Sequence, residues 1–133
     1  MFAGMAQSSL ETGRPIEPPA VFVGGGETTV DISGDGTGGP NQEFVLSGAL
    51  ELDEPGVTIA CVDTDGIDGN SDNAGGIVTD ETVTDRREAR QALARNDAAD
   101  YLADHRGVVR TGPTNTNVND LYVAVVTDGD GDA

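Results

Sequence analysis

The apolar residues of this chain occur in short runs that polar, glycine-rich segments separate. The clearest runs are Ala20 to Val23, Val57 to Val62 and Leu121 to Val126. Each run has the length of a β-strand, and none approaches the ~20 residues that a membrane helix needs. A chain of 133 residues also fits one compact domain. We therefore expect a single soluble folding unit with several short strands.

Helix-forming patterns lie between these runs. Pro40 stands where a first helical turn tolerates proline, and an apolar stripe at helical spacing follows it as far as Leu52. Asp85 and Glu88 have the spacing of a capping box, which predicts a helix from there through Arg95. Shorter elements are predicted at 98–104 (a helix), 77–78 and 108–110 (strands). This alternation predicts an α/β fold, a single domain with a mixed β-sheet and flanking helices.

The chain divides into three parts. Residues 1–19 contain three prolines, which favour extended chain over helix, so we expect a lead-in segment there. Residues 20–127 hold the α/β domain, and residues 128–133 form an acidic tail. At the start of the domain, residues 20–33 predict a hairpin that turns on consecutive glycines.

Acidic residues dominate the charge. The chain has 24 Asp and Glu residues against 7 Arg and no Lys, which gives a net charge of −17. Such a surface repels phosphate backbones, so we exclude nucleic acid as a partner. Disorder is the usual alternative for so much charge, but 36% apolar residues in strand-like runs argue against it. Molar salt shortens the Debye length to ~3 Å and removes the self-repulsion, which points to an extreme halophile.

The expected compartment is the cytoplasm. The chain has one cysteine, Cys61, which cannot form an internal disulfide and therefore fits a reducing environment. No basic segment followed by an apolar core opens the sequence, so no signal peptide is expected.

Residues 34–39 spell G-x-G-x-x-G between a predicted strand and a predicted helix. As a dinucleotide fingerprint, the glycines would admit a pyrophosphate and Asp63 would bind the ribose. The preceding residues 28–33 are half polar, whereas a central parallel strand is aliphatic throughout, which argues against a nicotinamide site. Two other interpretations stay open: a phosphate held by backbone N–H groups, or a plain connection from strand to helix.

The acidic loop 63–72 follows a buried strand. In the EF-hand register that begins at Asp68, neither the turn glycine nor the closing glutamate is present, so a calcium loop is not expected. Carboxylates just past a buried strand lie where α/β folds bind ligands, and Asp63 and Asp65 could hold Mg²⁺ there with water and phosphate. Solvent-facing adaptation to salt explains the same aspartates equally well.

Three segments carry a more specific pattern. They read GGGETTV (24–30) with GGPNQE (38–43), TDGIDG (64–69) and TGPTNTNVNDL (111–121). Together they resemble the C-terminal MOFRL domain of the type II glycerate kinases, over about Gly4 to Val126. The resemblance implies a larger N-terminal α/β domain in the same enzyme. It also implies transfer of phosphate from ATP, with Mg²⁺, to the 2-hydroxyl of D-glycerate, although some relatives carry the older name hydroxypyruvate reductase.

The chain departs from the family pattern at two positions. Pro40 stands where members of the family usually have arginine, so a cation that would neutralise substrate or phosphate is missing. Asn115 stands where glycine is usual, which narrows the freedom of the backbone near a ligand. The cationic side chains of the larger N-terminal domain are absent as well.

The predicted site draws on all of these segments. The predicted catalytic residues are Asp65, Asp68, Asn41 and Glu43, and the predicted metal ligands are Asp63 and Asp65. Predicted to bind substrate or phosphate are Gly24, Gly25, Gly26, Glu27, Thr28, Gly36, Gly38, Gly39, Thr111, Gly112, Thr114, Thr116, Asn117 and Asn119. For the last loop, self-satisfied Asx turns are the alternative.

The function expected from these residues is that of the C-terminal domain of an ATP-dependent glycerate 2-kinase. Because substrate and ATP are anions and the domain is acidic, a partner domain, in cis or in trans, must supply the positive groups. The isolated chain is therefore expected to be inactive. Two alternatives of other classes are a nicotinamide-dependent hydroxypyruvate reductase and a non-catalytic module that binds a small phosphorylated acid.

The charge imbalance predicts a strong dependence of folding on salt. Thermal unfolding, followed by circular dichroism, should occur at a clearly higher temperature in molar KCl than in dilute buffer, because screening relieves the repulsion between carboxylates. Equal unfolding temperatures in the two solutions would contradict adaptation to salt.

Overall fold

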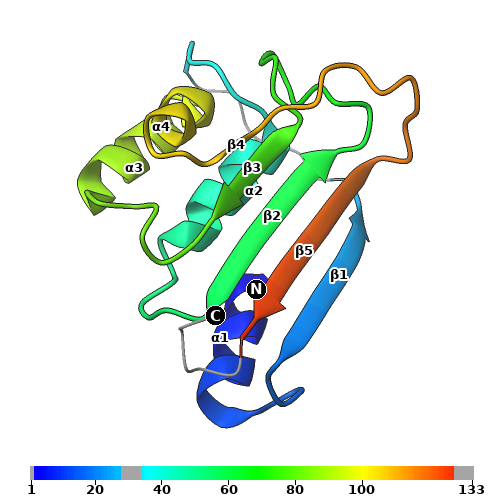
Figure 1. Cartoon of the computed structure of the whole chain (residues 1–133). Helices are drawn as coiled ribbons and strands as arrows, with labels where there is room; N and C mark the ends of the chain where they lie inside the picture. Colours follow the sequence, from blue (N-terminus) through cyan, green and yellow to red (C-terminus); the bar gives the residue numbers. More distant parts are fainter. Residues whose placement is uncertain (1, 28–33, 128–133) are drawn as a thin grey trace.

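The protein is built on one five-stranded sheet. In this computed structural model the described residues are 2–27 and 34–127 (Figure 1). The strands are β1 (Ala20–Gly26), β2 (Val57–Asp63), β3 (Gly75–Val78), β4 (Val108–Val109) and β5 (Asp120–Val126). Their order across the sheet is β1-β5-β2-β3-β4. The predicted α/β domain is confirmed, but the sheet differs from the expected mixed one because every pairing between described strands is antiparallel.

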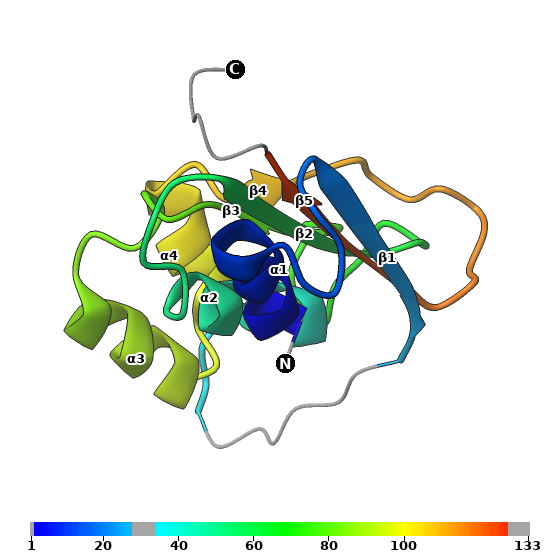
Figure 2. The same ribbon diagram turned by 90° about the horizontal axis from the view of Figure 1, so that it is seen from below.

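Helices cover one face of this sheet. They are α1 (Phe2–Thr12), α2 (Pro40–Ala49), α3 (Arg86–Ala94) and α4 (Ala98–Asp104). Seen from below, the helices lie on one side of the strands, with α1 and α2 directly against them (Figure 2). The core between them contains Leu46 of α2, Ile59 of β2, Leu102 of α4 and Ala124 of β5, each at most 1% exposed. Alternate residues of β2 and β5 point into this core, as expected for a sheet with one covered face.

The expected extended lead-in is wrong for residues 2–12, which form α1. Ala3 and Ala6 of this helix belong to the buried core, and Phe2 packs against Phe44 and Tyr122 with ring centroids 6.0 and 6.4 Å apart. The prolines that suggested extended chain all follow the helix, and residues 2–12 contain none. The helix therefore forms because small and apolar residues recur at helical spacing and bury one side against the sheet.

The predicted turn at residues 24–27 is wrong for its glycines. Gly24, Gly25 and Gly26 continue β1 and pair with residues 122, 121 and 120 of β5. The other half of the predicted hairpin, residues 28–33, lies outside the described residues, as does the tail 128–133.

A buried aspartate from a distant loop caps helix α2. The residue that precedes the helix is Gly39, which has no side chain to cap it. Instead, Asp68 Oδ1 accepts from the backbone and side-chain nitrogens of Asn41 (3.0 Å each), and its Oδ2 accepts from those of Gln42 (2.8 and 2.9 Å). Asp68 is fully buried. A carboxylate that receives four hydrogen bonds at the positive end of a helix stabilises that helix strongly.

The glycines of these loops permit close contact between backbones. A side chain at Gly39 would overlap the backbone of Asp68 and Gly69, and one at Gly66 would overlap Gly112. Gly66 also has φ +89°, in the region that glycine favours. Glycines in two of the segments that resemble the kinase family, 38–43 and 64–69, therefore allow neighbouring loops to pack closely.

Among the described residues, no helix combines the length and apolar character required to cross a membrane.

Removing the buried cap should destabilise the protein. Asp68→Ala leaves two backbone and two side-chain donors without their acceptor, so the free energy of unfolding should fall by about 3–5 kcal/mol in denaturant titrations. Asp72→Ala is the matched control in the same loop, because the Asp72 side chain is 90% exposed; its effect should stay within about 0.5 kcal/mol. Equal effects of the two substitutions would show that the cap is unimportant.

Candidate functional site

Two polar loops meet at the carboxyl end of β2. Thr64 forms most of the junction: its N–H and its hydroxyl donate to Asn119 O (3.0 and 2.8 Å), and its Oγ1 accepts from the N–H of Val118 (2.8 Å). Thr114 completes it by donating its N–H to Asp65 O (3.1 Å) and its hydroxyl to Thr64 O (2.5 Å). The structure thus brings the predicted acidic loop and the predicted substrate loop together.

A shallow, open cavity of about 460 Å³ lies beside this junction. It is lined by Asp65, Ile67, Pro113, Asn115, Thr116 and Asn117. Three of these, Asp65, Thr116 and Asn117, are predicted site residues, and they present a carboxylate, a hydroxyl and an amide. This combination is suited to a small polar ligand, since few but convergent polar groups define such sites.

Thr114 and Asn119 serve the junction itself, and Thr111 donates its hydroxyl to Gly112 O at 2.8 Å. Asn115 has φ +63° and Asn119 has φ +68°, so the loop bends through the left-handed region without glycine at these positions. The departure at Asn115 is therefore tolerated by the backbone. Part of the predicted substrate set is structural, as the Asx-turn alternative proposed, with Asn117 Oδ1 accepting from the N–H of Asn119 (2.8 Å).

Three carboxylates cluster at the end of the sheet. Asp63 is the register partner of Asp120, and its Oδ1 accepts from the N–H of Asp65 at 3.1 Å. The pKa of Asp63 is raised, first by burial and further by the side chains of Asp65 and Asp120. Two adjacent carboxylates that disfavour each other's charge suit a divalent cation held by one or two protein oxygens. Among the described residues, no three acidic, His or Cys side chains are arranged to hold a metal ion alone.

Asn41 and Asp68, both predicted to be catalytic, are buried beneath this cluster. Asn41 Nδ2 donates to Asp68 Oδ1 (3.0 Å) and to Asp120 Oδ1 (2.9 Å), and Asn41 Oδ1 accepts from Cys61 Sγ. Both residues are at most 1% exposed. They link α2 to the start of β5. Because both are buried, they support the carboxylate cluster and do not line the cavity.

Glu43 points to a different part of the molecule. Its carboxylate accepts from Asn96 Nδ2 at 3.1 and 3.4 Å, beside the junction of α3 and α4. Burial raises the pKa of Glu43, the Asn96 hydrogen bond lowers it and the charge of Asp68 raises it again. The four predicted catalytic residues therefore do not converge on one cavity.

Four of the backbone N–H groups in the glycine loop 34–39 donate hydrogen bonds to protein acceptors. Gly34 donates to Asn96 Oδ1 (2.9 Å), Gly36 to Arg95 O (3.0 Å), Thr37 to Asp97 Oδ1 (2.9 Å) and Gly38 to Asn70 Oδ1 (2.8 Å). These bonds tie the loop to the α3–α4 connection and to the acidic loop. Two interpretations of this loop were open besides dinucleotide binding, namely a phosphate site and a plain connection from strand to helix. These contacts are those of a plain connection.

The predicted phosphate-binding residues Gly24, Gly25, Gly26 and Glu27 lie at the edge of the sheet. In the described residues β1 is an edge strand, and Gly25, Gly26 and Glu27 are exposed there. Thr28 falls outside the described residues. None of the described residues among them lines the cavity beside Asp65.

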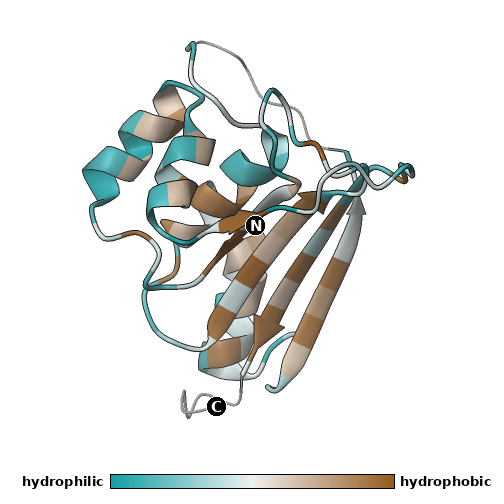
Figure 3. Ribbon diagram, turned by 45° about the horizontal axis from the view of Figure 1, so that its top comes forward, coloured by the Kyte–Doolittle hydropathy of each residue, from teal (hydrophilic) through white to brown (hydrophobic). Residues whose placement is uncertain are grey.

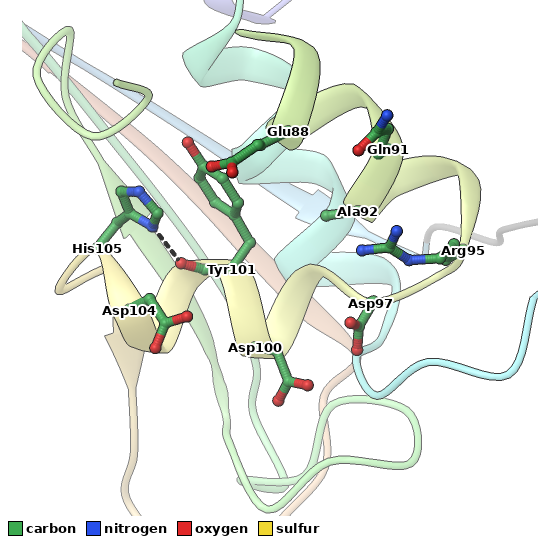
Figure 4. Close-up of a pocket in the computed structure, with 9 residues that line it drawn as sticks. All are labelled: Glu88, Gln91, Ala92, Arg95, Asp97, Asp100, Tyr101, Asp104 and His105. Atoms are coloured by element: carbon green, nitrogen blue, oxygen red, sulfur yellow. Dashed lines mark hydrogen bonds between the residues drawn. The ribbon is translucent and has the colours of Figure 1, made fainter. Parts of the chain in front are cut away.

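A second, smaller cavity of about 260 Å³ lies between side chains of α3 and α4 (Figure 4). It contains none of the predicted site residues. Tyr101 and His105 stack there with ring centroids 3.9 Å apart, and Tyr101 Oη is buried without a hydrogen-bond partner among the described residues. The pKa of Asp100 is raised, chiefly by the charge of Asp97. Four carboxylates against one arginine make this second cavity repulsive to phosphate.

Sequence reasoning missed the acceptors that hold the loops. Asp120 lies inside a resembling segment but was not assigned a role, and Asn70 and Asn96 belong to no recognised motif. Their partners are 79, 32 and 62 residues away. Only the density of short polar residues near glycines signalled such contacts.

Comparison with known proteins places this geometry in a family. The model of the MOFRL family matches residues 20–120. Glycerate 2-kinase from Pyrococcus horikoshii is 44% identical over 133 residues, which cover 96% of this chain and 30% of that protein. The crystal structure of glycerate kinase from Thermotoga maritima superposes with a TM-score of 0.91 at 38% identity, covering 95% of this chain and 32% of that one.

A relative from Agrobacterium vitis, 41% identical over 133 residues, is named for hydroxypyruvate reductase; the match covers 95% of this chain and 34% of that protein. The chain thus spans about a third of the length of these relatives. Their similarity extends through both polar loops and the strands that carry them, and the chain belongs to the MOFRL family.

Proposed function

We propose that this chain is the MOFRL domain of an ATP-dependent glycerate 2-kinase, which transfers phosphate from ATP to the 2-hydroxyl of D-glycerate. The observation that supports this most directly is the likeness to the Thermotoga maritima glycerate kinase over 95% of the chain, at a TM-score of 0.91. The segments 64–69 and 111–121, which resemble the family, also meet in one place, beside an open cavity.

Phosphoryl transfer depends mainly on positioning and on neutralising charge. In this chain, Thr116 and Asn117 line the cavity and would orient hydroxyl or carboxylate oxygens of the substrate. Asp63 and Asp65 are the residues that would hold Mg²⁺, which when bound offsets negative charge on the phosphates. Asn41 and Asp68 would keep the carboxylates in place through Asp120.

The positive charge that the reaction needs must come from elsewhere. Arg110 is near the loop in sequence, but its side chain is 69% exposed and lies 3.9 Å from Asp72. Pro40 begins α2, and it supplies no charge where the resemblance to the glycerate kinases implies an arginine in most members. We therefore assign the cationic groups to the part of the kinase that the relatives have and this chain does not span.

The geometry gives the nicotinamide alternative no support. A dinucleotide fingerprint needs N–H groups of the glycine loop aimed at a pyrophosphate, next to parallel strands. Here the N–H groups of Gly36 and Gly38 donate to protein acceptors, and β1 and β2 are separated by antiparallel β5. Hydroxypyruvate-dependent oxidation of NADH by the chain would reinstate this alternative.

The kinase proposal is tested in a chimera in which this chain replaces the matched region of the Thermotoga maritima enzyme. We expect ADP formation that depends on D-glycerate in the chimera and none from the isolated chain, because no cationic side chain among the described residues of this chain lines the cavity. Asp65→Asn should lower kcat by about 100-fold or more, since it removes a charge that faces the reacting groups. Asp72→Asn is the control and should leave kcat unchanged.

Turnover by the isolated chain with ATP, Mg²⁺ and D-glycerate would contradict the need for a second part. If phosphoglycerate raised the melting temperature of a chimera that shows no turnover, the result would favour the non-catalytic binding module instead.

The pH dependence of the free energy of unfolding tests whether the charge of Glu43 is disfavoured in the folded protein. Its folded-state pKa is raised, so between the ordinary value and the folded value the native state binds more protons than the unfolded state, and stability falls as pH rises through this window. Glu43→Gln keeps an acceptor for Asn96 and removes the charge. The variant should therefore lose less stability than wild type as pH rises from 4 to neutrality, in denaturant titrations. A steeper loss in the variant would contradict this.

A further inference from the structure

One face of the sheet is apolar, and no helix or strand within residues 2–27 and 34–127 covers it (Figure 2). In Figure 2 the helices lie on one side of the strands and no described element crosses the other side. We call this side the open face. Its members are Val21 and Val23 of β1, Leu121, Val123 and Val125 of β5, Thr58, Ala60 and Val62 of β2, and Ile77 of β3. Hydrophobic colour runs along these strands in Figure 3.

The strand register shows that these residues share one surface. Val125 is opposite Val21 on one side and Thr58 on the other, and Val123 is opposite Val23 and Ala60 in the same way. Residues paired directly across an antiparallel sheet point to the same face. The buried residues of β2 and β5 alternate with these and face the helices.

The open face is unusual for a chain of this charge. None of its described members is charged, although the chain carries 24 acidic residues. Val23 is 66% exposed, Val21 59% and Val125 40%. Contiguous exposed apolar residues free of charge mark an interaction site in a soluble protein.

The size of the open face limits what can cover it. Three of its strands have seven residues each. With strands ~4.8 Å apart and ~3.3 Å per residue, these three strands span about 330 Å². Contact with a partner would bury about 670 Å² in total, which is at the lower end of the range of contacts between domains of one chain, ~600–1,500 Å². It is below the ~1,200–2,000 Å² of stable complexes between separate proteins.

A second copy of this chain is a poor occupant. Two copies would bring together molecules of net charge −17 each, across an area too small for a stable dimer. The kinase relatives, in contrast, carry about two thirds of their length outside the matched region. A polypeptide joined to this domain needs less contact area, because its effective concentration is high.

We propose that the open face packs against the part of the glycerate kinase polypeptide that the relatives have outside the matched region, through an apolar surface on that part. This inference rests on the proposed function, because it takes the partner from the kinase. Covering the open face would place that part of the kinase against β1, β5 and β2, whose ends carry the carboxylate cluster on the opposite face.

The chimera with the Thermotoga maritima kinase tests this contact by thermal unfolding, without ATP or glycerate. Wild type should unfold in one cooperative transition. The pair Val23→Asp and Val123→Asp should lower the melting temperature by about 5 °C or more, or split the transition in two, because two charges would be buried in the contact. Ile16→Asp is the matched control, 51% exposed and outside the open face, and should leave the transition unchanged.

The same pair should lower the melting temperature of the isolated chain by less than that of the chimera, because the two aspartates repel each other across the strands in both but are buried only in the contact. The difference between the two shifts measures the contact. Two independent transitions in the wild-type chimera, or equal effects of the pair in the chimera and in the isolated chain, would overturn the proposal. A stable dimer of the isolated chain in molar KCl that the pair dissociates would also overturn it, in favour of a second copy. A chimera that unfolds as proposed but lacks kinase activity would refute the function and leave the contact standing.

Discussion

The arrangement of the polar loops depends on the buried carboxylate of Asp68. It accepts four hydrogen bonds from two consecutive residues at the start of α2, and Asn41 passes the contact on to Asp120 at the start of β5. A loop, a helix and a strand far apart in the sequence are thereby fixed relative to one another. A buried carboxylate is stable only when donors hydrogen-bond to its oxygens. We therefore expect the loop, the helix and the strand to form cooperatively.

Local patterns predicted the elements whose signals are local. The Asp85 cap accepts from the N–H groups of Arg87 and Glu88 as its spacing indicated, and the helix at 98–104 has the predicted bounds. The sequence analysis did not predict helix α1, because the helix is stabilised by tertiary contacts. Its small residues Ala3 and Ala6 are buried against the sheet. The antiparallel order of the strands was missed for a similar reason, since pairing between distant runs leaves no trace in either run.

The candidate site shows the same division. The segments that resemble the family meet in the structure, and Asp65, Thr116 and Asn117 line one cavity. Sequence could not separate side chains that face the cavity from those that hold it. Asp65 and Asp68 lie three residues apart in one loop, yet the first lines the cavity and the second is fully buried. Glycines carried a similar ambiguity, because close approach to a phosphate and close approach to another backbone require the same residue.

Strand β5 has a consequence for the order of assembly. It follows the other described strands in the sequence but inserts between β1 and β2, so these two have no partner in common until residues 120–126 are available. During synthesis, β1 must wait for almost the whole domain to leave the ribosome before its hydrogen bonds can close. Folding of this domain is therefore governed by long-range closure, and shortening it at the carboxyl end would divide the sheet instead of trimming its edge.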